Sequence, residues 1–236
     1  MRAKRARLQT IVERLRQEYP EAECALIHEN PVQLLVATIL SAQCTDERVN
    51  RVTPGLFQKY PDAAALAAVD PAELEREIHS TGFFRNKAKN IRSCCQALVE
   101  DHDGVVPREM KDLVKLPGVG RKTANVVLGA CFDLPAITVD THCGRLSRRL
   151  GLTANTDPEK VEKDLQQILP QAHWWFFSTA IIWHGRRVCH SRRPACDRCV
   201  LTDLCPSSTA PALAADRTPI PFDGAQAQSS GEALLS

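Results

Sequence analysis

Residues 116–127 read Leu-Pro-Gly-Val-Gly-Arg-Lys-Thr-Ala-Asn-Val-Val, a glycine-rich turn between two helical stretches. We expect a short amphipathic helix over residues 109–115 and a more apolar one over residues 121–132. Gly118 and Gly120 permit left-handed or closely approached backbone, and Pro117 stiffens the turn. Backbone N–H groups at the start of the second helix then face outward. These N–H groups form an anion site suited to a phosphate. The turn is not a nucleotide-binding P-loop, because no strand precedes its glycines.

Lys122 falls in the first turn of that second helix, where a cation opposes the helix dipole. Two interpretations stay open: a cation that contacts phosphate, or a neutral amine that acts as a nucleophile. The dipole, partial burial and nearby Arg121 would favour the neutral amine. Asp140 supports the nucleophile, because it is the single carboxylate that ends the apolar run 134–140. As the N-cap of the following helix, Asp140 would be ordinary.

Ten cysteines are more than the core of a cytosolic protein needs, and four of them lie within 17 residues, separated by six, two and five residues. Their loop is too polar to bury itself, and soft thiolates select zinc or iron–sulfur. One close pair flanked by two single cysteines, the last followed by proline, favours a four-iron cluster, with zinc left open. The four candidate ligands are Cys189, Cys196, Cys199 and Cys205. The others are predicted to pack in the core: Cys24, Cys44, Cys94, Cys95, Cys131 and Cys143.

Helical periodicity dominates the rest of the chain, and strand signals are limited to residues 105–106 and 136–139. Asp70-Pro71 and Asp157-Pro158 mark helix starts, with proline at the first helical position. Residues 206–236 are rich in Ser, Ala, Pro, Gly and Gln and are predicted to be a disordered tail. The expected helices span residues 4–18, 31–42, 45–59, 71–79, 84–101, 109–115, 121–132, 141–150, 158–169 and 173–187.

Composition narrows the class of protein. No apolar run is long enough to span a membrane, and the basic N-terminus lacks the apolar stretch of a secretory peptide. We therefore expect a cytoplasmic protein with reduced cysteines. The net charge of +2 averages an acidic tail against basic segments at residues 2–16, 108–149 and 185–195. On charge alone, solvated helix faces and nucleic-acid contacts are equally good explanations.

Together, the glycine turn with Lys122, the Val139-Asp-Thr-His segment and the cysteine spacing resemble the endonuclease III family of DNA glycosylases, in the helix–hairpin–helix superfamily. Ser41-Ala-Gln-Cys-Thr-Asp and Lys87-Ala-Lys-Asn-Ile agree more weakly. The resemblance covers residues 22–205 and implies an all-α, two-domain fold. One domain would span residues 24–134 and carry the hairpin. The other would combine residues 1–23 with 135–205 and hold a [4Fe–4S] cluster.

The resemblance also assigns residues. Lys122 and Asp140 match the catalytic pair, and the four clustered cysteines match the cluster ligands. Gln43 would fill the gap left by a flipped base, and Phe83 takes a wedge position where the family commonly has leucine; core packing is its alternative. The implied DNA contacts, including these two, are Gln43, Phe83, Leu116, Gly118, Val119, Gly120, Arg121, Thr123, His142, Arg186, Arg192 and Arg193. Arg187 would add a phosphate contact.

The implied activity is a bifunctional DNA glycosylase and abasic-site lyase that removes oxidised pyrimidines from duplex DNA. The protein would act as a monomer on duplexes with damaged bases or abasic sites, with no membrane partner. A monofunctional mismatch glycosylase for adenine or thymine is the nearest alternative, and the adenine branch lacks the lysine at position 122. A DNA-binding module with a zinc site leaves Asp140 unused. A redox protein leaves the glycine turn unexplained.

Overall fold

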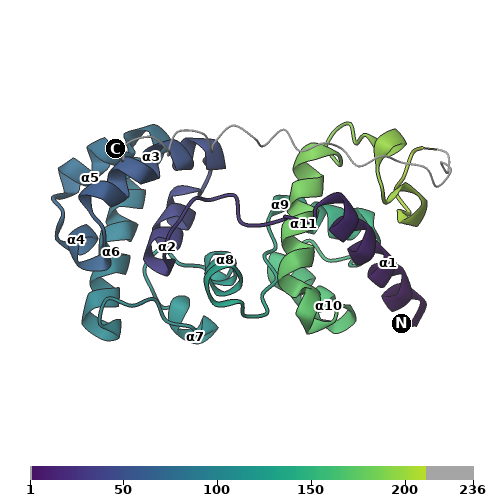
Figure 1. Ribbon diagram of the computed structural model, residues 1–236, viewed down its shortest axis with the longest axis horizontal. Helices are drawn as coiled ribbons and strands as arrows, with labels where there is room; N and C mark the ends of the chain where they lie inside the picture. Colours follow the sequence, from purple (N-terminus) through teal and green to yellow (C-terminus); the bar gives the residue numbers. More distant parts are fainter. Residues whose placement is uncertain (1, 211–236) are drawn as a thin grey trace, which may run out of the picture.

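The computed structural model describes residues 2–210 and contains, within that range, eleven α-helices, four short 3₁₀ helices and no strand (Figure 1). The all-α class predicted from the periodicity is therefore confirmed. The α-helices are α1 (Arg2–Glu18), α2 (Pro31–Leu40), α3 (Asp46–Lys59), α4 (Ala63–Ala68), α5 (Pro71–Ile78), α6 (Phe84–His102), α7 (Met110–Leu113), α8 (Arg121–Phe132), α9 (Thr141–Arg149), α10 (Pro158–Ile168) and α11 (Trp174–Arg187). The 3₁₀ helices are η1 (His79–Thr81), η2 (Gln171–His173), η3 (Cys196–Arg198) and η4 (Thr202–Leu204).

Two separate hydrophobic cores organise these helices. The first runs from Leu26 to Ala136 and is built by α2 to α8. The second joins α1 to α9, α10, α11 and the cysteine loop, and runs from Leu8 to Ala22 and again from Ile137 to Leu201. Figure 1 shows the resulting path: the chain begins in one body, crosses to α2, and returns after α8. The two crossings bring residues 22–26 and 136–140 to the junction between the cores.

Side-chain caps fix where six of the helices begin. In each case an oxygen of the capping side chain accepts a hydrogen bond from a backbone N–H in the first turn, which would otherwise be unsatisfied. Proline follows the cap at the first position of α5 and α10, as the sequence predicts. The caps are Asn30, Thr45, Asp62, Asp70, Asp140 and Asp157.

The structure adds one helix that periodicity did not predict. Residues 63–68 form α4, which has only six residues, too few for an apolar period to show. Asp62 caps it, and Ala63 and Leu66 bury it against the first core. Tertiary packing therefore stabilises a segment whose local pattern is weak.

The predicted tail begins too early. Residues 206–210 are described, and Ser208 is tied to the cysteine loop because its Oγ lies 2.9 Å from Thr202 Oγ1 and its N–H donates to Cys205 O at 3.0 Å. A polar composition concealed these local hydrogen bonds. The predicted disorder of residues 211–236 lies outside the described residues. None of the helices within residues 2–210 combines the length and apolar character that crossing a bilayer requires.

Candidate active site and metal centre

A pocket of about 610 Å³ of empty space lies at the junction of the two cores and contains both Lys122 and Asp140. Its wall is formed by the two segments that cross between the cores and by α2, α3, α8 and α11. Lys122 comes from a helix of the first core and Asp140 from the start of a helix of the second core, and both line this one pocket. The lining residues are Glu23, Cys24, Ala25, Leu26, Thr38, Ser41, Asp46, Lys122, Val126, Thr138, Asp140, Trp175, Thr179, Ile182, Trp183 and Arg186.

Lys122 is the second residue of α8, whose N-cap, Gly120, has no side chain. The partial burial and the help from Arg121 that the sequence suggested are wrong, because Lys122 is exposed and Arg121 is engaged elsewhere. Arg121 makes two hydrogen bonds to the buried Glu162, Nε to Oε2 at 2.7 Å and Nη2 to Oε1 at 2.8 Å.

Asp140 is the N-cap of α9 and accepts a hydrogen bond from Cys143 N–H to Oδ1 at 2.7 Å. The preceding segment is extended and buried, and Asn125 of α8 fixes it by donating from Nδ2 to the Ile137 carbonyl at 2.9 Å. The cap uses one of the two carboxylate oxygens. Among the described residues, no hydrogen bond engages Oδ2. Asp140 can therefore cap α9 and face a ligand in the pocket at the same time.

The glycine turn between α7 and α8 has the backbone that the sequence predicted. Gly118 has φ +76°, and a Cβ there would lie 2.8 Å from the Cβ of Asn90, so position 118 is restricted to glycine twice over. The side chains of Leu116 and Val119 are buried in the first core, which leaves their backbone as the part available to a ligand. At Gly120 a Cβ would meet nothing within 4 Å, which leaves space for an anion beside the uncapped start of α8.

Gln43 and Phe83 share an uncommon conformation. Both are non-glycine residues with positive φ, +52° and +49°, and both side chains are exposed. Phe83 is 62% exposed, which excludes the core-packing alternative. Such backbone strain persists only when the surroundings hold it, and it is concentrated at functional sites. Lys87 supplies part of that hold: its buried Nζ donates to the Thr81 carbonyl at 2.8 Å, just before the Phe83 turn.

The predicted arginine contacts differ in their environment. Arg192 and Arg193 are exposed in the cysteine loop. Arg186 lines the pocket and pairs with Asp46, Nη1 to Oδ2 at 2.5 Å, across the two cores. Arg187 instead lies over the indole of Trp183, with its Cζ 4.2 Å from the ring centroid.

Thr123 and His142, the other predicted contacts, are half-buried. Desolvation lowers the pKa of His142, whose Nδ1 lies 3.2 Å from Nη2 of Arg145. His142 also packs closely on α11, because a Cβ added at Gly185 would lie 2.9 Å from the Cβ of His142. His142 thus contributes to the contact between α9 and α11.

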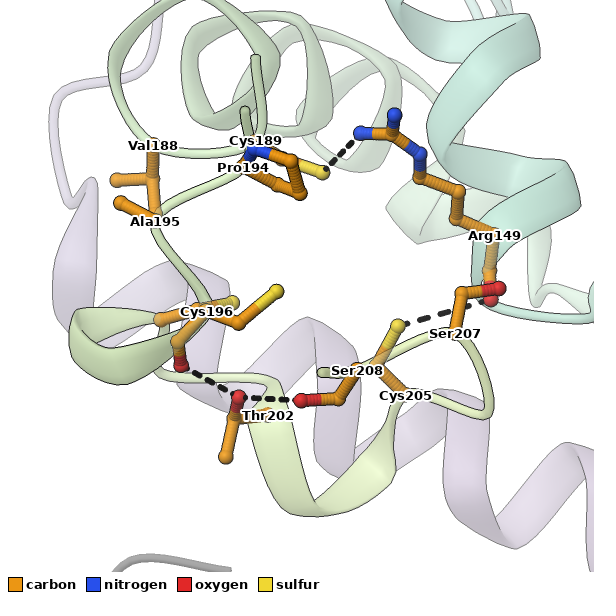
Figure 2. Close-up of a pocket in the computed structure, with 11 residues that line it drawn as sticks. Arg149, Val188, Cys189, Pro194, Ala195, Cys196, Thr202, Cys205, Ser207 and Ser208 are labelled. Atoms are coloured by element: carbon orange, nitrogen blue, oxygen red, sulfur yellow. Dashed lines mark hydrogen bonds between the residues drawn. The ribbon is translucent and has the colours of Figure 1, made fainter. Parts of the chain in front are cut away.

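The four clustered cysteines line a second cavity, of about 310 Å³ of empty space. Figure 2 shows Cys189, Cys196 and Cys205 around this hollow, with Arg149 beside Cys189. Arg149 donates from Nη1 to the Cys189 sulfur at 3.1 Å and to the His190 carbonyl at 2.8 Å. The N–H of Leu201 donates to the Cys199 sulfur at 3.4 Å. N–H donors directed at sulfur are the usual surroundings of iron–sulfur thiolates.

The chemistry of this cavity fits an iron–sulfur cluster, because its four cysteines supply the all-sulfur ligand set that such clusters use. Burial raises the pKa of Cys199 to about 12 and also raises that of Cys205. Thiolates at these positions therefore need a cationic partner, which an iron cluster supplies.

Sequence reasoning missed several residues of both sites. Trp175 and Trp183 line the first pocket, but the aromatic run in residues 174–177 looks like core packing. Cys24 packs against the first core, as the sequence predicts, and also lines the pocket. Nothing in the sequence distinguished Arg149 from the other basic residues of its helix as a neighbour of the cysteines. His184 is buried and touches the Cys199 sulfur through Nε2 at 3.2 Å.

Comparison with protein families gives two matches. Residues 36–171 match the family described as HhH-GPD superfamily base excision DNA repair protein. Residues 189–205 match the iron-sulfur binding domain of endonuclease III. The second match spans all four cysteines that line the smaller cavity.

Known proteins named endonuclease III are similar over most of the chain. The one from Synechocystis sp. is 59% identical over 211 residues, which is 89% of this chain and 96% of that protein. The one from Bacillus subtilis is 50% identical, covering 79% of this chain and 86% of that protein. The one from Escherichia coli K12 is 38% identical, covering 83% and 92%.

Solved structures agree with these similarities. A trapped endonuclease III–DNA covalent intermediate is 44% identical, with a TM-score of 0.82, and the match covers 86% of this chain and 96% of that one. A thermostable thymine-DNA glycosylase is 21% identical, with a TM-score of 0.78 over 87% of this chain and 97% of that one. The second likeness shows the shared fold alone.

Proposed function

The chain belongs to the endonuclease III family, within the HhH-GPD superfamily of base excision DNA repair proteins, and from this premise we propose that Lys122 is its nucleophile and Asp140 the assisting carboxylate. The protein is a DNA glycosylase and abasic-site lyase that carries a [4Fe–4S] cluster. The observation that supports the two roles is that a lysine from α8 and a carboxylate from the start of α9 line one pocket between the cores.

Base release requires the sugar of the damaged nucleotide to enter this pocket. Because C1′ is shielded inside a duplex, the nucleotide must first be flipped out of the stack. The neutral Lys122 amine then attacks C1′, and the glycosidic bond breaks with its electron pair leaving on the base. Asp140 stabilises the positive charge that develops on the sugar and helps Lys122 to lose its proton. The attached amine then gives up one proton, its lone pair forms the C1′=N bond, and the C1′–O4′ bond breaks with its electron pair leaving on O4′, which takes up a proton. The product is a Schiff base between Lys122 Nζ and C1′.

Strand cleavage follows from that intermediate. The Schiff base draws electrons from C2′, so a C2′ proton is lost. The new electron pair forms a C2′–C3′ double bond, and the C3′–oxygen bond breaks with its electrons leaving on the 3′ phosphate. This β-elimination cuts the strand on the 3′ side, and water then releases Lys122.

We assign the DNA surface to the exposed groups around the pocket. The uncapped start of α8 and the backbone of the glycine turn would bind a phosphate. Gln43 and Phe83 would enter the duplex, where an apolar wedge unstacks neighbouring bases. Arg192 and Arg193 would contact phosphates from the cysteine loop. Cys189, Cys196, Cys199 and Cys205 would hold the cluster, whose chemistry here is to crosslink this loop.

We extend the proposal to the domains, the substrates and the oligomeric state. The two cores correspond to two domains, divided near residues 24 and 134. The substrates are oxidised pyrimidines in duplex DNA, and the active species is a monomer. The cytoplasmic location stays a prediction of the sequence. A monofunctional mismatch glycosylase is disfavoured, because it has no use for a lysine beside Asp140.

The experiment that tests the assignment is borohydride trapping. Reduction of the Schiff base links the protein covalently to DNA carrying an abasic site. Lys122→Gln should abolish the trapped adduct while DNA binding persists. Lys115→Gln, another exposed lysine of the hairpin, is the matched control and should trap normally. An undiminished adduct in Lys122→Gln would show that another amine attacks C1′.

A further inference from the structure

His184, in the last turn of α11, is a buried histidine that takes no part in the proposed chemistry. Each of its two ring nitrogens has a partner: Nε2 lies 3.2 Å from the Cys199 sulfur, and Nδ1 lies 2.9 Å from the Tyr19 hydroxyl. The backbone carbonyl of His184 also accepts a hydrogen bond from the N–H of Cys189 at 2.9 Å. His184 therefore contacts two of the four proposed cluster ligands, one through its ring and one through its backbone.

The two partners of the ring decide where its proton lies. A cysteine that binds iron is a thiolate, which can accept a hydrogen bond but has no proton to donate. Nε2 of His184 must therefore carry the proton that points at the Cys199 sulfur. Burial favours the neutral imidazole, which has a single N–H. Nδ1 is then an acceptor, and the Tyr19 hydroxyl donates to it.

Tyr19 is itself held in place by contacts of its backbone and of its ring. It follows the end of α1, where its N–H donates to the Leu15 carbonyl at 2.8 Å, and it is buried in the second core. Its ring centroid lies 6.3 Å from that of Trp183, with an interplanar angle of 77°, and 5.9 Å from that of His184. Phenylalanine at position 19 would keep these contacts and lose only the hydrogen bond to His184.

We propose that His184 is a positioning residue for the Cys199 thiolate, and that Tyr19 fixes the tautomer in which His184 can donate to it. The pair would thereby raise the reduction potential of the cluster. An N–H directed at a ligand sulfur withdraws electron density from it, which favours the cluster state that holds one more electron. The proposal rests on the proposed ligand set, because Cys199 must bind iron as a thiolate.

The test measures the reduction potential of the purified, cluster-containing protein at an electrode, which supplies the one electron of the couple. His184→Leu removes the donor and should lower the equilibrium constant for reduction by about tenfold, a shift of about 59 mV to lower potential. Tyr19→Phe leaves Nδ1 free to take the proton and should shift the potential in the same direction by less. His184→Gln restores a side-chain N–H and should recover part of the loss.

Tyr60→Phe is the matched control, because it removes the other tyrosine hydroxyl of the chain. That hydroxyl donates to Glu73 Oε1 at 2.7 Å, and Tyr60 packs against the first core. The potential of Tyr60→Phe should equal that of the wild type. A wild-type potential in His184→Leu would overturn the role of His184, and a wild-type potential in Tyr19→Phe would overturn that of Tyr19.

Nitrogen NMR with isotope-labelled histidine keeps the proposal falsifiable if His184→Leu does not fold or does not retain the cluster. In the wild type, the His184 ring should show a protonated Nε2 and a bare Nδ1. Tyr19→Phe should raise the fraction of the opposite tautomer. A wild-type protein with the proton on Nδ1 would contradict the proposal.

Cys199→Ser separates this inference from the ligand assignment on which it rests. If Cys199 binds the cluster, its loss should change the iron content or the potential. Unchanged iron content and potential in Cys199→Ser would overturn the ligand assignment. A changed cluster in Cys199→Ser together with a wild-type potential in His184→Leu would overturn the inference alone.

Discussion

Asp140 combines a structural task with the proposed chemical one. Its Oδ1 caps α9 by accepting a hydrogen bond from Cys143 N–H. Capping alone would explain why an aspartate stands at the start of this helix. The chemical role depends on the negative charge and on the place of the residue in the pocket with Lys122. The two tasks can be separated, because asparagine caps helices about as well as aspartate but carries no charge.

Asp140→Asn should therefore fold with nearly the wild-type stability and yet lose base release by about 10²–10⁴-fold, the usual contribution of a positioned acid–base group. Asp140→Ala should lose the same activity and also about 1 kcal/mol of stability, because the first turn of α9 loses its cap. Thermal unfolding and single-turnover base release measure the two effects. A fully active Asp140→Asn would contradict the chemical role.

At the scale of elements, the cysteine loop is held by more than its four thiolates. Arg149 reaches from α9 to the Cys189 sulfur and to two loop carbonyls, those of His190 and Ser191, the latter at 2.6 Å. Its own carbonyl lies 3.6 Å from the Cys205 sulfur. This one residue thus connects the first and last ligands of the loop.

Arg149→Met should weaken the retention of the cluster without removing a ligand. Losing the charged donor leaves the Cys189 thiolate less stabilised and the 190–191 segment less ordered. We expect faster bleaching of the visible absorption when the purified protein is incubated with an iron chelator. Arg148→Met, at the neighbouring position of α9, is the control. Equal bleaching rates for the two variants would show that Arg149 does not stabilise the cluster.

The same loop carries the exposed Arg192 and Arg193. If each neutralises one phosphate, the double variant Arg192→Ala, Arg193→Ala should bind duplex DNA more weakly at low salt. Its plot of log K against log salt should be shallower by about 2, since each phosphate contact contributes about 0.9. Lys160→Ala with Lys163→Ala removes two exposed charges from α10 and should leave the slope unchanged. A wild-type slope in the arginine variant would exclude them as phosphate contacts.

For the whole molecule, the junction between the cores decides whether the pocket exists. Trp175 of α11 packs on α8 so tightly that a Cβ at Gly129 would lie 2.1 Å from its ring. Arg121 of α8 pairs with the buried Glu162 of α10. Glu162 raises the pKa of Arg121, as expected for a cation held by a carboxylate. The first contact holds the last turn of α8 and the second holds its start, so that Lys122 is fixed against the second core.

Arg121→Met should destabilise the protein by about 1–3 kcal/mol, because it removes the cation from the buried Glu162 carboxylate, to which Gln166 Nε2 still donates at 3.1 Å. The double variant Arg121→Met, Glu162→Leu should recover most of that loss, since an apolar pair of similar volume can replace a buried ion pair. Denaturant unfolding of both single variants and the double variant gives the coupling energy. An additive result would show that the pair does not hold the cores together.

The sequence by itself determined the α-helices other than α4, the glycine turn and the candidate ligands, because each depends on local periodicity, on a cap or on spacing along the chain. It also placed Lys122 at the start of α8 and Asp140 at the start of α9. Only the tertiary structure decided that these two share a pocket, because they belong to different cores and their meeting depends on how those cores pack. The same packing turned Arg121 toward Glu162, buried Leu116 and brought Trp183 into the pocket wall. Lys122 and Asp140 are 18 positions apart, and Arg121 and Glu162 are 41 positions apart, so no helical periodicity records either pairing.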